Sequence, residues 1–260
     1  MFKALHSGLT VGLIATPAHE LNTCTPHELI SDVLRRNPDD FDFLPVVDET
    51  HRFVGMFQAA AHRSRCTLST VWQCYVPLSE DLLLGADASI LDFVLDADEK
   101  QCRLVISGTK VVGLVSLSDL QRLPVRAALF ALITGLEMTM AELIRARHPK
   151  SEDWMQLLTS RRQAKIEEER KKAKSEDGYV DTLLFSQFCD KREIVTQNLP
   201  EPERSALSAA LEDIEELRNR VAHANEYASS PAQSKNVCRI VRQLLQLTDE
   251  FQDQMPDSSG

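Results

Sequence analysis

The sequence predicts an α+β protein built as a repeated β-α-β-β-α pattern followed by an all-α helical bundle. Short apolar, β-branched stretches separated by turn residues occur in two similar passes before residue 125. After that point, apolar residues recur at the three- and four-residue spacing of helices. We therefore expect one domain over residues 1–125 and a second over residues 126–260.

The composition is that of an ordinary globular protein, with 43% hydrophobic and 26% charged residues. A formal net charge of −10 argues against broad, charge-driven binding to nucleic acid. The apolar runs are shorter than the roughly 20 residues of a membrane span, and the N-terminal stretch does not resemble a signal peptide. Six widely spaced cysteines form no CxxC pair, which favours buried free thiols over a metal site. We expect a cytoplasmic protein with no membrane partner.

Two copies of one pattern fill the first domain. The first copy reads TVGLIA, HELISDVLRR and FDFLPVVDETHRFVGMF, and the second reads YVPLS, SILDFVLDAD and CRLVISGTKVVGLVSLSDL. Aligning Leu44 with Arg103 gives a period of 103 − 44 = 59, and aligning Gly55 with Gly113 gives 113 − 55 = 58. The turn SGTK is thus one residue shorter than DETHR. Each copy is expected to hold a leading strand, a helix, a hairpin of two strands and a closing helix.

This order, together with LPVVD…VGMF and RLVISGTKVVGLVSLSD, resembles a tandem pair of CBS domains (a Bateman module) over roughly residues 5–125. Such pairs typically bind adenine nucleotides or related ligands in the clefts between the two copies and act as regulatory sensors. The resemblance implies AMP, ADP or ATP as a regulatory ligand, with no cofactor required for catalysis.

The second copy carries the family's local signal, Gly-x-x-[Ser/Thr]-x-x-Asp, as Gly113, Ser116 and Asp119. An aspartate can accept hydrogen bonds from both ribose hydroxyls, and a serine beside a helix N-terminus can hold a phosphate. The same spacing also predicts an N-cap and a capping box that open the helix SDLQRL. Both interpretations remain open.

The other candidate ligand residues carry weaker signals. At the positions of Ser116 and Asp119, the first copy has Gln58 and Ala61, so at most one site of this type is expected. Thr16 and Ser79 follow the two leading strands and are candidates for lining the cleft. Each is more often only a turn residue.

The second domain is predicted to be helical throughout. Apolar residues from Leu129 to Ile144 recur at three and four residues, and Pro149 ends that helix. The run RRQAKIEEERKKAKSED is typical of a solvated helix. The expected helices span residues 125–148, 153–174, 182–198, 202–224 and 234–254, and the tail after them is expected to be disordered.

The segment LRNRVAHAN within residues 217–225 resembles the signature of catalytic members of the HEPN superfamily. LITGLEMTMAELIR resembles their first helix, which carries a glutamate at the place of Glu137. The resemblance covers roughly residues 126–255 and implies a dimeric, metal-independent ribonuclease. On this interpretation Arg218, Asn219, His223 and Glu137 form the catalytic set.

The chemistry of these residue types agrees with that resemblance. Histidine, with a pKa of about 6.5, can deprotonate a ribose 2′-hydroxyl or protonate the leaving 5′-oxygen. Arginine supplies a permanent charge for the phosphate. At about 3.6 residues per turn, Arg218 and His223 diverge by about 140° on a straight helix. A two-fold dimer would bring both residue types onto one phosphate, giving 2′,3′-cyclic phosphate and 5′-hydroxyl ends.

Two interpretations from different classes follow. The first is a homodimeric endoribonuclease that acts on RNA and is regulated by an adenine nucleotide, a design suited to toxin, antiphage or stress-response roles. The second is a non-catalytic nucleotide sensor joined to a helical dimerisation or partner-docking domain. In the second case Ile214, Leu217 and Val221 form the buried stripe of a helix, and the arginines and His223 are its polar face.

Overall fold

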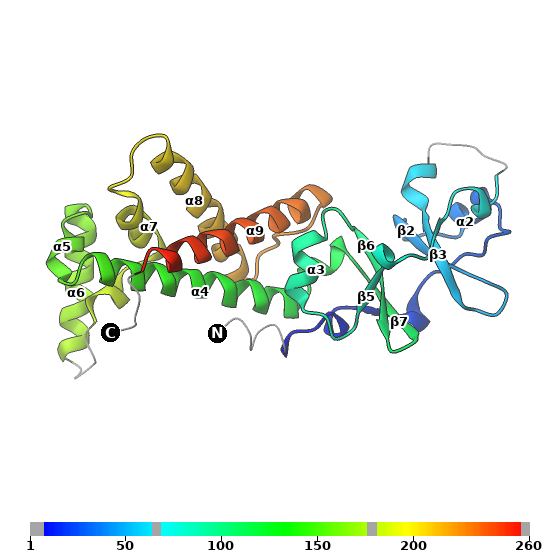
Figure 1. Cartoon of the computed structure of the whole chain (residues 1–260), viewed down its shortest axis with the longest axis horizontal. Helices are drawn as coiled ribbons and strands as arrows, with labels where there is room; N and C mark the ends of the chain where they lie inside the picture. Colours follow the sequence, from blue (N-terminus) through cyan, green and yellow to red (C-terminus); the bar gives the residue numbers. More distant parts are fainter. Residues whose placement is uncertain (1–7, 64–68, 176–180, 256–260) are drawn as a thin grey trace. The chain divides into compact units, whose positions relative to one another are not determined.

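The computed structural model describes residues 8–63, 69–175 and 181–255 (Figure 1). The chain forms two compact units. The first holds residues 2–125 and, in addition, Ala228–Lys235; the second holds Arg126–Tyr227 and Asn236–Gly260. The return of Ala228–Lys235 to the first unit differs from the expected assignment of all residues after 125 to one domain.

The first unit contains two sheets, one for each copy of the repeat, of which the four-stranded sheet is mixed and the three-stranded sheet is antiparallel. The four-stranded sheet has the order β1-β7-β6-β5, and the three-stranded sheet has the order β2-β3-β4. The hairpins β2–β3 and β6–β7 are antiparallel, as the repeat predicts, whereas β5 pairs with β6 in parallel. The strands are β1 (Thr16–Pro17), β2 (Phe43–Val47), β3 (Phe53–Gln58), β4 (Val76–Pro77), β5 (Leu83–Gly85), β6 (Cys102–Ser107) and β7 (Lys110–Ser116).

Each copy donates its leading segment to the sheet of the other copy. Strand β1 precedes the first copy's hairpin but pairs with β7 of the second, with Thr16 opposite Leu114. Strand β4 precedes the second copy's hairpin but pairs with β3 of the first. Two further bridges repeat this exchange, Thr10 with Ser89 and Leu29 with Thr70. Neither sheet is therefore complete without residues of the other copy.

A glycine stands at the closest approach of each exchanged segment. A Cβ on Gly113 would lie 2.5 Å from the carbonyl oxygen of Thr16, and a Cβ on Gly55 would lie 2.2 Å from that of Val76. Only glycine allows the two backbones to meet at these distances. The glycines aligned by the sequence repeat thus serve the exchange of strands.

We predict that Gly113→Ala lowers the free energy of unfolding by about 1–3 kcal/mol, because the new methyl group would push β1 away from β7. Chemical denaturation of the variant measures this change. Gly8→Ala is the matched control, since no atom lies within 4 Å of a Cβ at Gly8. Equal losses for the two variants would contradict the account of the close approach.

The helical parts of the first unit are short. The predicted helices over HELISDVLRR and SILDFVLDAD are present as α2 (Ile30–Arg35) and α3 (Ile90–Asp96), and the Ser89 side chain caps α3 by accepting from the Leu91 N–H. The closing helices are instead 3₁₀ turns, η3 (Ala59–His62) and η6 (Leu117–Gln121). TVGLIA holds a further 3₁₀ turn, η1 (Val11–Leu13), and not a strand. The remaining 3₁₀ turns of this unit are η2 (Ala18–Glu20), η4 (Val71–Gln73) and η5 (Glu80–Leu82).

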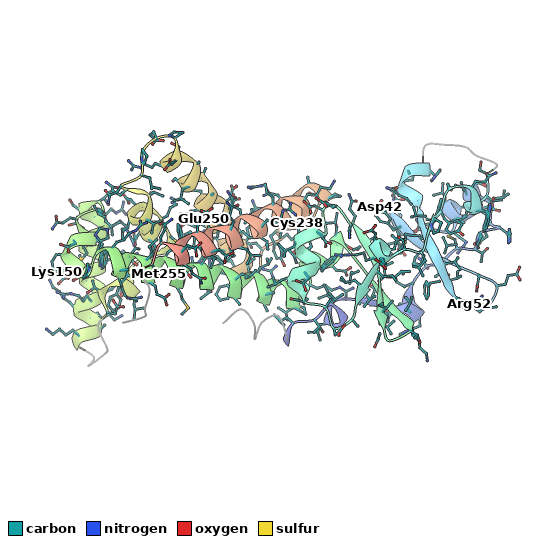
Figure 2. The ribbon with its side chains drawn as sticks, viewed as in Figure 1. Asp42, Arg52, Lys150, Cys238, Glu250 and Met255 are labelled. Carbon is teal, nitrogen blue, oxygen red and sulfur yellow. The ribbon has the colours of Figure 1, made fainter. Side chains whose placement is uncertain are left out.

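Apolar side chains fill the space between and beneath the sheets. Met56 of β3 packs with Cys102 and Leu104 of β6, so this cluster joins the two copies. Three of the five cysteines in the described part of the chain are buried, as expected, including Cys238, labelled in Figure 2. Cys74 and Cys189 are half-buried, and Cys66 lies outside the described residues. Burial raises the pKa of the Cys24 thiol to about 12, which makes it a poor nucleophile.

The second unit is helical, with two corrections to the expected boundaries. The predicted helix 153–174 is broken at Gln156–Thr159, where the Leu158 carbonyl accepts from the Gln163 side chain. The predicted helix 182–198 is broken at Ser186, because Gln187 and Asp190 form a capping box that begins a new helix. Residues 256–260, predicted to be disordered, lie outside the described residues. The elements are α4 (Leu123–Arg147), α5 (Ser151–Met155), α6 (Ser160–Ser175), η7 (Thr182–Phe185), α7 (Phe188–Thr196), α8 (Glu203–Ala222) and α9 (Pro231–Asp253).

Helix α4, of 25 residues, is the longest helix in the described part of the chain. In its most apolar 18-residue window the mean hydropathy is 1.6, enough for a membrane span by length and composition. The buried residues of α4 include Leu132, Leu136 and Met140, so its apolar surface lies inside the protein, with 61% of that window buried. The sequence analysis expected no apolar run long enough to span a membrane, and α4 differs from that expectation in length and hydropathy. Its burial is that of a core helix.

Candidate functional site

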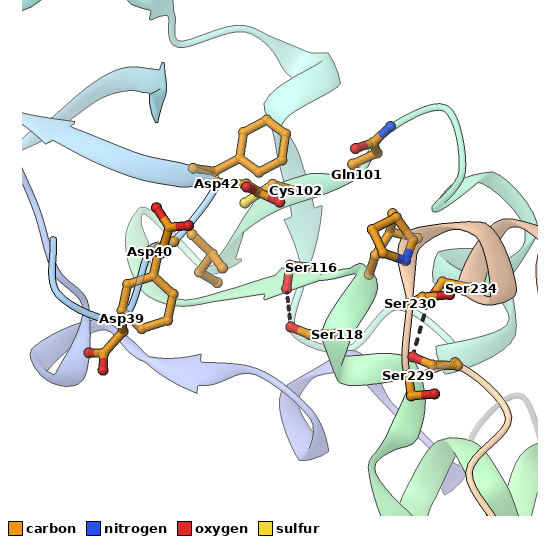
Figure 3. Close-up of a pocket in the computed structure, with 16 residues that line it drawn as sticks. Asp39, Asp40, Asp42, Gln101, Cys102, Ser116, Ser118, Ser229, Ser230 and Ser234 are labelled. Atoms are coloured by element: carbon orange, nitrogen blue, oxygen red, sulfur yellow. Dashed lines mark hydrogen bonds between the residues drawn. The ribbon is translucent and has the colours of Figure 1, made fainter. Parts of the chain in front are cut away.

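A cavity of about 280 Å³ lies within the first unit, at the edge where the two copies of the repeat meet (Figure 3). Its residues come from the segment before β2, the start of β6, the end of β7 with η6, and the segment that returns after α8. The lining residues are Asp39, Asp40, Phe41, Asp42, Phe43, Gln101, Cys102, Leu114, Ser116, Leu117, Ser118, Ala228, Ser229, Ser230, Pro231 and Ser234.

One wall of the cavity is acidic and aromatic. Asp39 and Asp40 lie on the side away from the returning serines, as Figure 3 shows. Arg63, which does not line the cavity, forms ion pairs with Asp40 at 2.6 Å and with Asp42 at 2.8 Å. Phe41 is 46% exposed although it is a large apolar side chain. An exposed ring at the edge of a cavity is suited to stacking on a flat ligand.

The opposite wall carries hydroxyl groups. Ser116, at the end of β7, and Ser118 share a hydrogen bond of 2.8 Å between their side-chain oxygens. Ser229 and Ser230 belong to the returning segment, as does the buried Ser234, whose hydroxyl donates to the Ala228 carbonyl at 3.2 Å. These groups offer both donors and acceptors to a polar ligand.

Asp119 does not line this cavity. Its carboxylate accepts a hydrogen bond from the Ser116 N–H at 2.7 Å, as the predicted capping box requires. It also accepts a hydrogen bond from the Arg122 guanidinium at 2.6 Å. Arg122 also donates to the Thr16 hydroxyl at 3.0 Å, so Thr16, Arg122 and Asp119 form one chain of contacts. Burial raises the pKa of Asp119, and the Ser116 and Arg122 hydrogen bonds oppose that shift.

The sequence-predicted ligand residues therefore separate into three groups. Ser116 lines the cavity. Thr16, Asp119 and the closely packed Gly113 lie together beside the β1–β7 pairing and are held by contacts within the chain. Ser79 is exposed at the start of η5, caps nothing with its side chain and is not among the lining residues.

The returning segment was not predicted to form part of a site. Ser230 and Gln233 cap the beginning of α9: the Gln233 N–H donates to the Ser230 hydroxyl at 3.3 Å, and the Gln233 amide oxygen accepts from the Ser229 N–H at 2.9 Å. The sequence signal was present, since Ser-Pro-Ala-Gln at 230–233 has the spacing of a capping box. Its place in the first unit depends on the fold alone.

In the helical unit, three of the four predicted catalytic residues lie in contact. Arg218 of α8 approaches the Glu137 carboxylate of α4 at 3.8 Å. Its guanidinium also donates weakly, at 3.4 Å, to the side-chain oxygen of the neighbouring Asn219. Both contacts are long, so the Arg218 charge is only loosely engaged.

Lys191 of α7 is a member of this cluster that sequence reasoning missed. It is 5% exposed, and its ammonium donates to Glu137 at 3.0 Å and to the Ser186 carbonyl at 2.8 Å. The short Lys191 contact holds one carboxylate oxygen of Glu137, and Arg218 approaches the other. A lone lysine in FCDKREIV gives no sequence signal for this role, because the pairing spans 54 residues.

His223 ends α8 and is exposed. Its backbone N–H still donates to the Asn219 carbonyl at 3.1 Å, and Ala224 follows with a positive φ of 54°. Arg126 of α4 closes this helix end by donating to the carbonyls of Arg220, Val221 and Asn225. In the described part of the chain, the His223 ring has no hydrogen bond or ion pair.

We predict that Lys191→Met lowers the free energy of unfolding by about 1–3 kcal/mol, because it leaves the Glu137 carboxylate and the Ser186 carbonyl without their donor. Urea denaturation followed by circular dichroism measures the change. The matched control is Lys172→Met on the exposed face of α6, expected to stay within about 0.5 kcal/mol of the parent. An unchanged stability for Lys191→Met would show that the buried pair is not a structural contact.

Comparison with known proteins finds similarity in structure only. No family model matches the chain, and no curated protein matches it in sequence. The CBS domain of a bacterial CNNM/CorC-family Mg²⁺ transporter in complex with ATP is 19% identical, covering 45% of this chain and 87% of that one with a TM-score of 0.38. CBSX2 from Arabidopsis thaliana in complex with AMP is 22% identical, covering 47% and 97% with a TM-score of 0.37.

A third similar structure is a CBS-domain-containing, hemolysin-like protein of Oenococcus oeni. It is 10% identical and covers 46% of this chain and 91% of its own, with a TM-score of 0.38. In all three, the similarity extends over less than half of this chain.

Proposed function

We propose that this protein is a homodimeric, metal-independent endoribonuclease whose first unit, a CBS-type pair, binds an adenine nucleotide that controls the activity. The observation that carries the catalytic part is the contact of Arg218 with Glu137. The exposed His223 follows Arg218 by five residues, at the C-terminal end of α8. The observation that carries the regulatory part is the cavity between the two copies of the repeat.

The reaction divides among the residues of the helical unit. His223 exchanges the proton, as base for the 2′-hydroxyl or as acid for the 5′-oxygen. Arg218 turns from its long contact with Glu137 to the phosphate and stabilises the negative charge of the transition state. Asn219 orients the phosphate or the imidazole, and Glu137, held by Lys191, keeps Arg218 in place when no substrate is bound. The products carry 2′,3′-cyclic phosphate and 5′-hydroxyl ends.

Exposed apolar side chains of the helical unit support the dimer. Phe130 and Met138 of α4 are 47% and 49% exposed, and Leu184 of η7 is 63% exposed. Met138 and Leu184 line the same hollow as Glu137 and Lys191. Apolar side chains that flank a charged cluster are suited to a second copy of the chain, which would supply the other half of a composite site.

The returning segment offers a route for regulation. Residues Ser229 and Ser230 line the cavity and follow His223 closely along the chain. A ligand that binds one arrangement of this segment more tightly than another shifts the population of the loop that begins at His223. A toxin, antiphage or stress-response role suits an enzyme controlled in this way.

The second candidate is a non-catalytic sensor with a helical docking or dimerisation unit. It is favoured by two ion pairs of the helical unit, Arg145 with Asp181 and Arg220 with Glu216, because arginines that are paired with carboxylates offer less positive charge to RNA. The two candidates differ in whether RNA is cut.

We predict that His223→Ala lowers the rate of RNA cleavage in EDTA by about 100-fold or more, because the proton transfer loses its catalyst. The assay uses labelled mixed RNA, with analysis of the product ends. His148→Ala, in the same unit at the end of α4, is the matched control and keeps the parent rate. If the parent protein does not cut RNA but still binds the nucleotide, the result would support the non-catalytic sensor.

We predict that Met138→Glu converts the dimer to a monomer at micromolar concentration and lowers RNA cleavage in parallel, because a carboxylate replaces an apolar contact. Light scattering after size-exclusion chromatography gives the mass. Leu13→Glu adds the same charge at an exposed apolar residue of the first unit and leaves the mass unchanged. A monomeric parent that still cuts RNA would refute the composite site.

A further inference from the structure

The charge around the cavity defines the class of ligand that fits it. None of the described lining residues is a lysine, arginine or histidine, whereas three are aspartates. Arg63 compensates one of these charges and is shared between Asp40 and Asp42. Asp39 has no ion pair in the described part of the chain. The described surroundings are thus negative overall, which disfavours a polyphosphate.

Several of the backbone donors that could hold a phosphate at this cavity are engaged by acceptors of the chain itself. A phosphate commonly sits at a helix N-terminus, where free N–H groups and a serine point toward it. At the start of η6, the Asp119 carboxylate takes the Ser116 N–H at 2.7 Å. At the start of α9, the Ser230 hydroxyl takes the Gln233 N–H at 3.3 Å, and Pro231 has no N–H. At each of the two turns that border the cavity, an acceptor of the chain thus holds one N–H group that a phosphate would otherwise compete for.

The size and the remaining groups suit a nucleoside. A volume of about 280 Å³ is at the lower end of the roughly 300–1,000 Å³ found for small-molecule sites. Phe41 offers a ring for a base. The hydroxyls of Ser118 and Ser229 bond to Ser116 and to the Gln233 amide oxygen within the chain, and as neutral groups they can exchange these bonds for bonds to ribose hydroxyls. The Asp39 carboxylate, which has no ion pair among the described residues, can accept hydrogen bonds from sugar hydroxyls or an exocyclic amine, and repels an added phosphate.

We infer that this cavity selects nucleosides of low negative charge and binds adenosine more tightly than ATP, with AMP between them. This rests on the proposed function of the first unit as a sensor of adenine-containing ligands and narrows its ligand class. Under this selectivity the signal that reaches the helical unit is the breakdown of adenine nucleotides, because adenosine and AMP are their dephosphorylated forms.

Calorimetric titration of the whole chain with adenosine, AMP and ATP, each in EDTA and in Mg²⁺, tests the inference. We expect ATP to bind at least about tenfold more weakly than adenosine in both buffers. Phe41→Ala should weaken adenosine binding several-fold, and this loss of affinity would show that adenosine binds in this cavity. ATP binding as tightly as adenosine, in either buffer, would overturn the inference and leave the proposed sensor standing. Failure of all three ligands to bind would overturn both.

A charge variant makes the test specific. Asp39→Asn removes one negative charge without breaking an ion pair of the described residues, and should narrow the preference for adenosine over ATP by about two- to threefold. Asp92→Asn makes the same change at an exposed position of α3 outside the cavity, and should leave the preference unchanged. Equal effects of the two variants would show that the selectivity does not come from the cavity wall.

Discussion

The exchange of leading segments between the two copies is the constraint on which the first unit depends. Each copy completes the sheet of the other: β1 pairs with β7, and β4 pairs with β3. Glycines at positions 55 and 113 let the crossing backbones approach, and Met56, Cys102 and Leu104 bury the surface between the copies. Because neither copy is complete alone, the two fold as one body, and the cavity at their shared edge has walls from both.

The helical unit depends on a different interaction, the pairing of buried or half-buried charges between helices. Arg162 and the buried Asp190 join α6 to α7 through two hydrogen bonds, at 2.7 and 2.6 Å. Lys191, the residue after Asp190, then reaches Glu137 on α4, and Glu137 faces Arg218 on α8. Removing one partner of such a pair leaves the other charge uncompensated, so the pairs fix how the helices meet. The catalytic set proposed here stands at the end of this series.

The parts of the structure that were predictable from the sequence are those governed by local rules. The repeat period, the two hairpins and the capping box of Ser116 and Asp119 follow from turn residues and spacing, and the structure contains all three. The length and the apolar face of α8 follow from its periodicity. The break at Ser186 could also have been found, since Gln187 and Asp190 have the spacing of a cap.

The rest depends on contacts between residues far apart in the chain. The repeat does not reveal that β1 pairs with the other copy, because both pairings satisfy the same pattern. Likewise, nothing local in Ser229-Ser230-Pro231 indicates a cavity wall, and nothing around Lys191 indicates a partner 54 residues away. For Asp119 the motif allowed two interpretations, a ligand contact and a capping box, and the structure shows only that its carboxylate bonds to Ser116 and Arg122.

The most direct measurement of the central claim, that the ligand of the first unit controls the chemistry of the second, is the rate of RNA cleavage in EDTA across a range of adenosine concentrations. The account predicts that the rate moves between two plateaus, with its midpoint at the dissociation constant found by calorimetry, because the ligand must favour one arrangement of the chain. A rate that is unchanged at saturating adenosine would contradict it.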